Sequence, residues 1–131
     1  MREIRYRGIG IAERKWVFGS LWFDTRNEAT LIWSEELEYW VRVDPSTVGE
    51  YTGLKDKNGK EIYEGDVIRS PLSEDKTRPH RIFYHTGNAA FMGALVDRKE
   101  LCYLRLDQDW IYKFGKEVIG NIHDNPELIE K

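Results

Sequence analysis

The sequence predicts an all-β protein in the form of a small, strongly coiled barrel, and three observations predict it. Short apolar runs recur between glycine, asparagine, aspartate and proline residues, with almost no helical periodicity of useful length. The chain carries 5 Trp, 7 Tyr and 5 Phe, residue types that suit a pleated, half-buried surface. Turn signals follow one another so closely over residues 55–66 that the strands between them must coil strongly.

Residues 1–43 are predicted to form N-terminal β-hairpin strands. Apolar and arginine side chains alternate over residues 4–7, as in a strand with one buried face. Residues 15–23 fit either a tight hairpin that turns at the central glycine or one strand with a glycine bulge. Two further strands are expected, over residues 29–33 and 37–43.

Residues 44–131 are predicted to form the barrel-like core, SH3-like or similar, so that 1–131 is a single domain. Asp44-Pro45 ends the first half, because proline lacks a donor N–H and favours an extended predecessor. Asn58-Gly59 supplies the positive φ of a tight turn. Strands are expected over residues 48–54, 61–63, 66–69, 81–85, 90–96, 101–106 and 117–122.

The C-terminal residues carry the best helix signal in the chain. Asp124 or Asn125 can cap a helix, Pro126 suits its first position, and Glu127 complements its positive end. We expect a single short helical turn there. Residues 70–79 combine two prolines with charged side chains and are predicted to be a flexible loop.

Composition limits the classes of partner and compartment. With 20 basic and 23 acidic residues, the formal charge of −3 argues against a protein whose main partner is the nucleic-acid backbone. Cys102 is the only cysteine, which excludes an intrachain disulfide and fits a reducing cytoplasm. We see no secretory signal and no apolar run near the 18 or so residues of a membrane span.

Three segments together resemble the YopX family, small proteins encoded by bacteriophages and prophages. The opening residues 2–7, the block over 44–68 and the closing residues 117–129 are similar to the family's segments in the same order. The chain departs from the family pattern after Arg7, where it continues with Gly8-Ile9-Gly10-Ile11. The resemblance implies a largely β fold, possible self-assembly and a phage or prophage setting, so the expected location is the cytoplasm of the bacterial host cell. It implies no activity.

No catalytic, cofactor or metal site is predicted. The imidazoles of His80, His85 and His123 and the single thiol do not form a ligand pattern, so we expect no metal. The lone glycine pair Gly8-Ile9-Gly10 precedes no helix and indicates a flexible turn rather than a phosphate cradle.

Two groups of carboxylates leave a hydrolase open as a third hypothesis. Asp107 and Asp109 alternate onto one face of an extended chain, and Asp124 follows His123. A polar turn and a helix cap explain the same residues without catalysis.

Our main functional hypothesis is a non-enzymatic protein-interaction module of phage or prophage origin. It would be a homo-oligomer or bind a host or phage protein. If Tyr39 and Val41 face inward, Trp40 faces outward between Glu38 and Arg42, as an interface anchor flanked by opposite charges. The alternative is that Trp40 packs beneath the N-terminal hairpin.

A nucleic-acid-binding small barrel is the alternative function. Arg5 and Arg7 are expected to share an outward face, and Lys76, Arg78 and Arg81 flank the predicted loop. Basic side chains beside aromatic rings are the means by which small barrels hold single strands.

Overall fold

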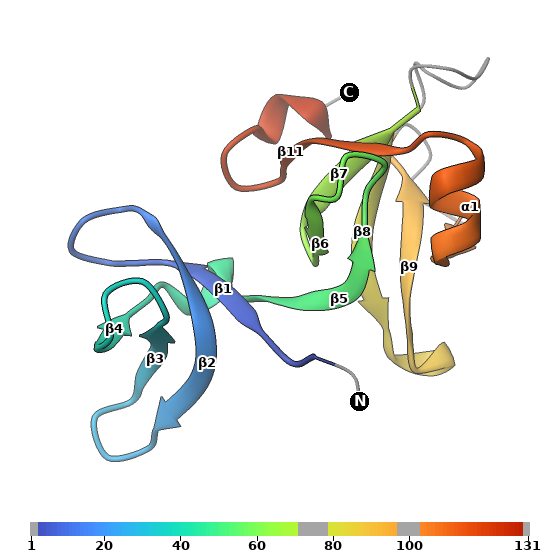
Figure 1. The fold of residues 1–131 in the computed structure, drawn as a ribbon. Helices are drawn as coiled ribbons and strands as arrows, with labels where there is room; N and C mark the ends of the chain where they lie inside the picture. The colour runs from blue at the N-terminus through green and yellow to red at the C-terminus, as the bar shows by residue number, and fades with distance from the viewer. Residues whose placement is uncertain (1–2, 71–78, 97–102, 130–131) are drawn as a thin grey trace. The chain divides into compact units, whose positions relative to one another are not determined.

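The computed structural model describes residues 3–70, 79–96 and 103–129, and these residues form a mostly β structure with two antiparallel sheets. The chain divides into two compact units, Met1–Tyr51 and Thr52–Lys131. Figure 1 shows the strands and the one short α-helix of the described part. The all-β prediction is confirmed. No closed barrel is found among the described residues, so the finer prediction of an SH3-like barrel over 44–131 is not confirmed.

The N-terminal unit is an antiparallel meander in which each strand pairs with the next along the chain. The strand order is β4-β3-β2-β1, and β1 also pairs with the first residues of β5. The strands are β1 (Tyr6–Ile9), β2 (Trp16–Asp24), β3 (Ala29–Ser34), β4 (Trp40–Arg42) and β5 (Gly49–Lys55).

This sheet curls on itself around a small apolar core. Gly10, just beyond β1, forms an isolated bridge with Val43, and the Asp44 N–H donates to the Ile9 carbonyl (2.9 Å). The curl encloses Val17, Ile32 and Val43, all of them buried. The segment that we predicted to be a flexible turn, Gly8 to Gly10, is therefore ordered strand and bridge, and that prediction is wrong.

Residues 16–24 form one continuous strand, which decides between the two predicted readings of this segment. Tyr6 and Ser34 both pair with Gly19, so the glycine lies in the middle of the sheet. A Cβ atom at Gly19 would overlap the Trp33 carbonyl oxygen. The glycine is needed for this close approach of two strands, and no turn occurs there.

The N-terminal unit ends at Tyr51 and therefore includes the start of β5. A 3₁₀ helix, η1 (Pro45–Thr47), follows Asp44, whose side chain caps it by accepting from the Ser46 N–H. The chain then returns to β1: Glu50 pairs with Tyr6. The Tyr51 N–H donates to the Arg5 carbonyl (2.8 Å). These pairings hold the first residues of β5 in the N-terminal unit.

The C-terminal unit contains a second antiparallel sheet. Its order is β10-β9-β8-β7-β11, while β6 pairs with β5. The strands are β6 (Glu61–Tyr63), β7 (Asp66–Arg69), β8 (His80–His85), β9 (Ala90–Leu95), β10 (Tyr103–Arg105) and β11 (Glu117–Asn121). The core contains Ile62, Ile68, Ile82, Leu106 and Ile111.

One helix was missed by the sequence prediction. Residues Gln108–Lys113 form α1, and the Asp107 carboxylate caps it by accepting from the Trp110 N–H (2.7 Å). Asp109 therefore lies on a helix and not in a polar turn, so the expected alternation of Asp107 and Asp109 onto one face of a strand is wrong. The C-terminal turn is present as a 3₁₀ helix, η3 (Pro126–Leu128), with Asn125 at its N-cap position.

Two buried aspartates organise the turns of the C-terminal unit. Asp56, 1% exposed, accepts from the N–H groups of Asn58 (2.8 Å), Lys60 (2.9 Å) and Val118 (3.0 Å). Asp66, also 1% exposed, accepts from the Tyr63 N–H (2.8 Å). Because buried backbone donors must be satisfied, these carboxylates fix the β5–β6 turn against β11 and the β6–β7 turn.

Candidate interaction site

Three tryptophans from three neighbouring strands meet on one face of the N-terminal unit. Trp22 lies on β2, Trp33 on β3 and Trp40 on β4. The ring centroids of Trp22 and Trp40 are 5.5 Å apart, and those of Trp33 and Trp40 are 5.6 Å apart, both pairs inclined rather than stacked flat. Such tilted contacts are the geometry that aromatic pairs prefer.

The strand register explains why these rings meet. Residues that are directly paired across an antiparallel sheet project to the same face, and Trp33 is paired with Trp40. Trp22 lies two residues along β2 from Ser20, the partner of Trp33, and therefore shares that face. Ile32, one residue from Trp33, is fully buried on the opposite face. The sheet thus has a core face and an aromatic face.

The aromatic face remains open to solvent. Trp22 is 48%, Trp33 38% and Trp40 42% exposed. We call these three residues the tryptophan surface. Large rings gathered in one exposed cluster, rather than scattered singly, are typical of a contact surface.

Trp40 is 42% exposed, with its predicted neighbours on either side of it along the chain, but Tyr39, which the hypothesis turned inward, is also exposed (52%). Glu38 lies in the turn before β4, with a positive φ of 57°, and Arg42 is the last residue of β4. Trp40 does pack on other side chains, but these are the two other tryptophans. Sequence reasoning found Trp40 and missed Trp22 and Trp33, because only the strand register brings them to it.

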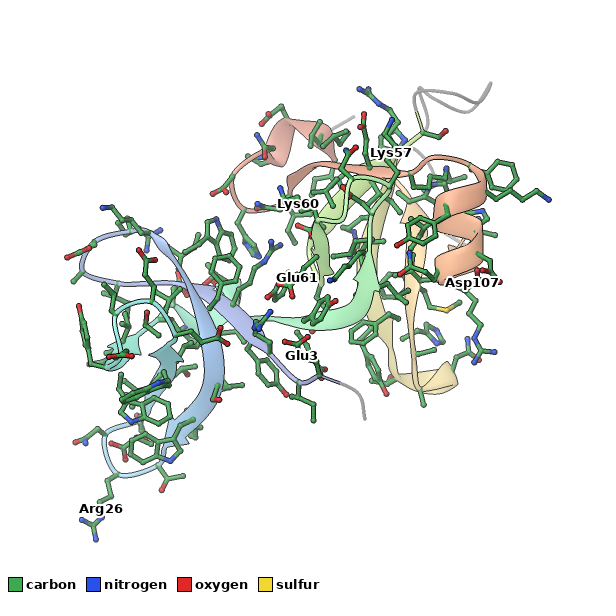
Figure 2. The ribbon with its side chains drawn as sticks, in the orientation of Figure 1. Glu3, Arg26, Lys57, Lys60, Glu61 and Asp107 are labelled. Carbon is green, nitrogen blue, oxygen red and sulfur yellow. The ribbon has the colours of Figure 1, made fainter. Side chains whose placement is uncertain are left out.

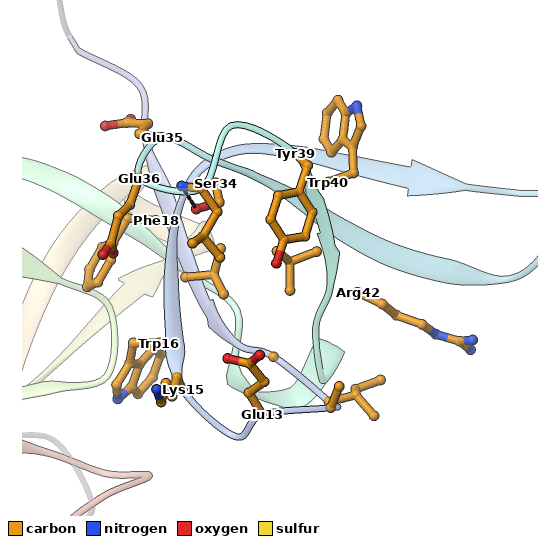
Figure 3. Close-up of a pocket in the computed structure, with 16 residues that line it drawn as sticks. Glu13, Lys15, Trp16, Phe18, Ser34, Glu35, Glu36, Tyr39, Trp40 and Arg42 are labelled. Atoms are coloured by element: carbon orange, nitrogen blue, oxygen red, sulfur yellow. Dashed lines mark hydrogen bonds between the residues drawn. The ribbon is translucent and has the colours of Figure 1, made fainter.

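A pocket of about 580 Å³ lies beside β4 within the same unit. Its walls come from two turns, residues 10–15 between β1 and β2 and residues 34–39 between β3 and β4, together with the start of β2 and β4 itself. Figure 3 shows Tyr39 and Glu13 pointing toward each other across the pocket, while Arg42 points away from it. The pocket and the tryptophan surface therefore share β4 as a wall.

The basic residues proposed for nucleic acid are largely engaged with protein groups in the N-terminal unit. Arg5 forms ion pairs with Glu3 (2.7 Å) and Glu35 (2.9 Å). Arg7 is 6% exposed, and its guanidinium lies 4.5 Å from the Trp16 ring centroid. The prediction that Arg5 and Arg7 share an outward face is therefore wrong for Arg7, because its guanidinium is covered.

The remaining candidates for nucleic-acid contact lie in the C-terminal unit. Arg81 on β8 is half-buried, and its guanidinium lies 5.4 Å from the Phe83 ring centroid. Lys76 and Arg78 lie outside the described residues, as does Cys102. In the N-terminal unit, Arg26 points into solvent at the tip of the β2–β3 turn (Figure 2).

Two of the carboxylates considered for catalysis, and two of the histidines considered for a metal, make structural contacts. Asp107 caps α1, and Asp124 accepts from the Asn121 side-chain amide (3.1 Å). His80 is buried, with its ring edge-on to Trp110. His85 accepts from the Asn88 N–H (3.1 Å). Within the described ranges, no group of three or more His, Cys, Asp and Glu side chains could hold a metal ion.

The YopX protein family model matches residues 5–130. The chain belongs to the YopX family. Among solved structures, it is similar to the crystal structure of protein EF1440 from Enterococcus faecalis, with 26% identity and a TM-score of 0.65. That similarity covers 99% of this chain and 100% of the other. No curated protein matches.

In the parts of this YopX-family chain that the structure describes, no helix is both long and apolar enough to cross a membrane.

Proposed function

We propose that this YopX-family chain is a non-enzymatic protein-interaction module of phage or prophage origin, and that it self-assembles through the tryptophan surface. The observation that supports this most is the exposure of three mutually packed indole rings on one sheet face. Tryptophan is the residue type most enriched at positions that dominate binding energy. An exposed cluster of this kind gains by burial against a partner.

The charges beside Trp40 favour a second copy as the partner. Most homo-oligomers are related by a two-fold axis, which places each surface patch against itself. An axis near Trp40 that runs the two chains antiparallel brings Glu38 of one copy opposite Arg42 of the other, twice per interface. The patch is therefore self-complementary in both charge and apolar character.

β4 also ends the strand order of the N-terminal unit and is only three residues long. A short edge strand limits uncontrolled pairing, so specificity has to come from side chains. The tryptophans and the two flanking charges provide those side chains.

Sedimentation velocity over a range of protein concentrations tests the proposal. We expect the native chain to form a dimer or larger closed oligomer, and Trp22→Ala to shift it toward monomer by at least tenfold in dissociation constant. Tyr112→Ala, which removes a 54% exposed aromatic ring from the C-terminal unit, is the matched control and should leave the mass unchanged. A native chain that stays monomeric at every concentration contradicts self-assembly.

Charge reversal tests the two-fold arrangement directly. Glu38→Arg alone and Arg42→Glu alone place like charges opposite each other and should weaken assembly. Mixing the two variants in equal amounts should restore it, because each hetero-pair then has two opposite-charge contacts. If mixing restores nothing, the partner surface lies elsewhere. A salt-dependent mobility shift with short single strands would favour the nucleic-acid alternative instead.

A further inference from the structure

The pocket beside β4 is a second candidate site, which adjoins the tryptophan surface at Trp40. We infer that it binds a basic side chain, lysine or arginine, presented with neighbouring apolar residues by an extended peptide segment of a partner. This inference rests on the shape, the lining and the charge of the pocket. It holds whether or not the chain self-assembles.

Space and an apolar floor are the first requirements, and both are present. The volume of about 580 Å³ lies in the range of roughly 300–1,000 Å³ that accommodates drug-sized ligands, and thus a short peptide segment. The floor contains Val17, which is 8% exposed, and the half-buried Val41. Leu37 and Ile11, 48% and 46% exposed, extend this apolar lining toward solvent.

The polar groups aimed into the pocket are acceptors that suit a cation. The Glu13 carboxylate and the Tyr39 hydroxyl point toward each other across the space (Figure 3). Glu36 adds a second carboxylate to the lining, whereas Glu35 is already paired with Arg5. A carboxylate over an apolar floor favours a charged donor, since hydrogen bonds between ionised groups are about twice as strong as neutral ones.

An aromatic ring completes the fit to a basic side chain. Tyr39 lines the pocket from the second turn, whereas Trp16 and Phe18 alternate with Val17 along β2, and the Trp16 ring already lies 4.5 Å from the Arg7 guanidinium. The face of a ring such as that of Tyr39 attracts ammonium and guanidinium groups, and its flat surface packs against an aliphatic stem. Of the two basic residues in the lining, Arg42 points away, so that Lys15 alone opposes Glu13 and Glu36.

The two turns that form the walls are held in place by their own hydrogen bonds. In the first, the Gly10 N–H donates to the Lys15 carbonyl (2.8 Å) and the Arg14 N–H to the Gly10 carbonyl (3.0 Å). In the second, Ser34 accepts from the N–H groups of Leu37 (2.9 Å) and Glu38 (2.8 Å). A preformed pocket loses little entropy when a ligand enters, which favours binding.

Nuclear magnetic resonance titration of the full chain tests the inference. The probes are N-acetyl-Leu-Lys-Leu-amide and its counterparts with glutamine or glutamate in place of lysine. We expect the lysine peptide to shift the amide signals of Gly10, Ile11 and Val41, with about tenfold weaker binding of the glutamine peptide and none of the glutamate peptide. Equal binding of all three peptides, or shifts confined to Trp22 and Trp33, would overturn it.

Variants separate this site from the proposed self-assembly. Glu13→Gln should weaken lysine-peptide binding about tenfold, while Glu28→Gln, an exposed glutamate in the β2–β3 turn, should leave it unchanged. Both variants should keep the oligomeric state of the native chain. Conversely, Trp22→Ala should retain peptide binding, because Trp22 does not line the pocket. Unchanged peptide binding by Glu13→Gln would show that this carboxylate does not select the ligand.

Discussion

The two units use their unusual residues in opposite ways. The N-terminal unit places Trp22, Trp33 and Trp40 on its surface, 38% to 48% exposed. The C-terminal unit places Asp56 and Asp66 in its interior, each 1% exposed and bonded to backbone N–H groups. Exposed aromatic rings and buried carboxylates are both costly arrangements in isolation. The cost of the buried carboxylates is offset within the fold by these hydrogen bonds, and we propose that a partner offsets the cost of the exposed rings.

This difference explains why a family resemblance can be specific and still say little about activity. The block over residues 44–68 resembles the family, and its aspartates Asp44, Asp56 and Asp66 each accept hydrogen bonds from nearby backbone in turns. Such residues preserve turn geometry. The tryptophan surface and the pocket both lie before this block, in residues 10–42. The three aspartates of this block are therefore structural, and the proposed interaction residues lie outside the block.

The largest expected loss of stability comes from removing a buried carboxylate of the C-terminal unit. Asp56→Ala leaves three backbone donors without their carboxylate and should lower the free energy of unfolding by about 4 kcal/mol, since each orphaned donor costs about 1–3 kcal/mol. Urea denaturation measures the loss. Asp109→Ala, at an exposed helical aspartate, is the control, with an expected change within about 0.5 kcal/mol. A small loss for Asp56→Ala would mean that the turn forms without its carboxylate.

The next largest losses of stability are expected when one glycine in each unit is replaced by alanine. Gly19→Ala forces β2 and β3 apart at the Trp33 carbonyl and should destabilise the chain by about 2–3 kcal/mol. Gly59→Ala has open space around it and a φ of 83°, so only backbone strain of about 1 kcal/mol is expected. Gly19→Ala should also weaken self-assembly, because Trp33 would be displaced. Equal thermal denaturation midpoints for the two variants would contradict the close approach of β2 and β3 at Gly19.

Local signals in the sequence predicted most of the strands, whereas long-range contacts account for what it missed. The Asn58-Gly59 turn was predictable because its residues themselves supply the backbone geometry. The helix α1 was missed because it has six residues and only Ile111 among them is buried, which is too short for a helical period. Gly10 was misread because its partner is Val43, more than thirty residues away.

The candidate site was predictable only in part, for the same reason. Alternation along one strand indicated that Trp40 faces outward. That Trp22 and Trp33 join it depends on the registers of β2 with β3 and of β3 with β4. The pocket depends on two turns that are separated in the sequence by residues 16–33. No pattern within either turn indicates the other.

A smaller loss of stability is expected when a ring of the tryptophan surface is removed. Trp40→Ala removes two ring contacts worth about 0.5–1.5 kcal/mol each and should destabilise the monomer by about 1–2 kcal/mol. Ile32→Ala, on the core face of the neighbouring strand, should cost about 3 kcal/mol. Trp40→Ala should nevertheless reduce assembly far more than Ile32→Ala does. Denaturation and sedimentation of both variants at one concentration measure the two effects; the reverse order would place the contact surface on another face.

The smallest effect on stability is expected at Asp24, which accepts a backbone hydrogen bond in the same local geometry as Asp56. Asp24 accepts from the Arg26 N–H (3.0 Å) as Asp56 does from the Asn58 N–H (2.8 Å), two residues on in each turn. Asp24 is half-buried, and its pKa is lowered chiefly because the Asn27 side-chain amide donates to it; desolvation opposes this, and the backbone N–H groups of Arg26 and Asn27 make smaller lowering contributions.

Because the folded-state pKa of Asp24 is lowered, its contribution to stability is present above the unfolded-state pKa and is lost as the pH falls through the folded-state pKa. Asn27→Ala should therefore raise the pKa of Asp24 toward its ordinary value and weaken the acid dependence of unfolding, as followed by carboxyl carbon resonances between about pH 2 and 6. Asn88→Ala, in a turn of the other unit, is the control. An unchanged pKa of Asp24 in Asn27→Ala would assign the lowering to the backbone donors. The size of the effect should remain far below that of Asp56→Ala, since water can replace a lost partner at the more accessible carboxylate of Asp24 and is excluded from the buried Asp56.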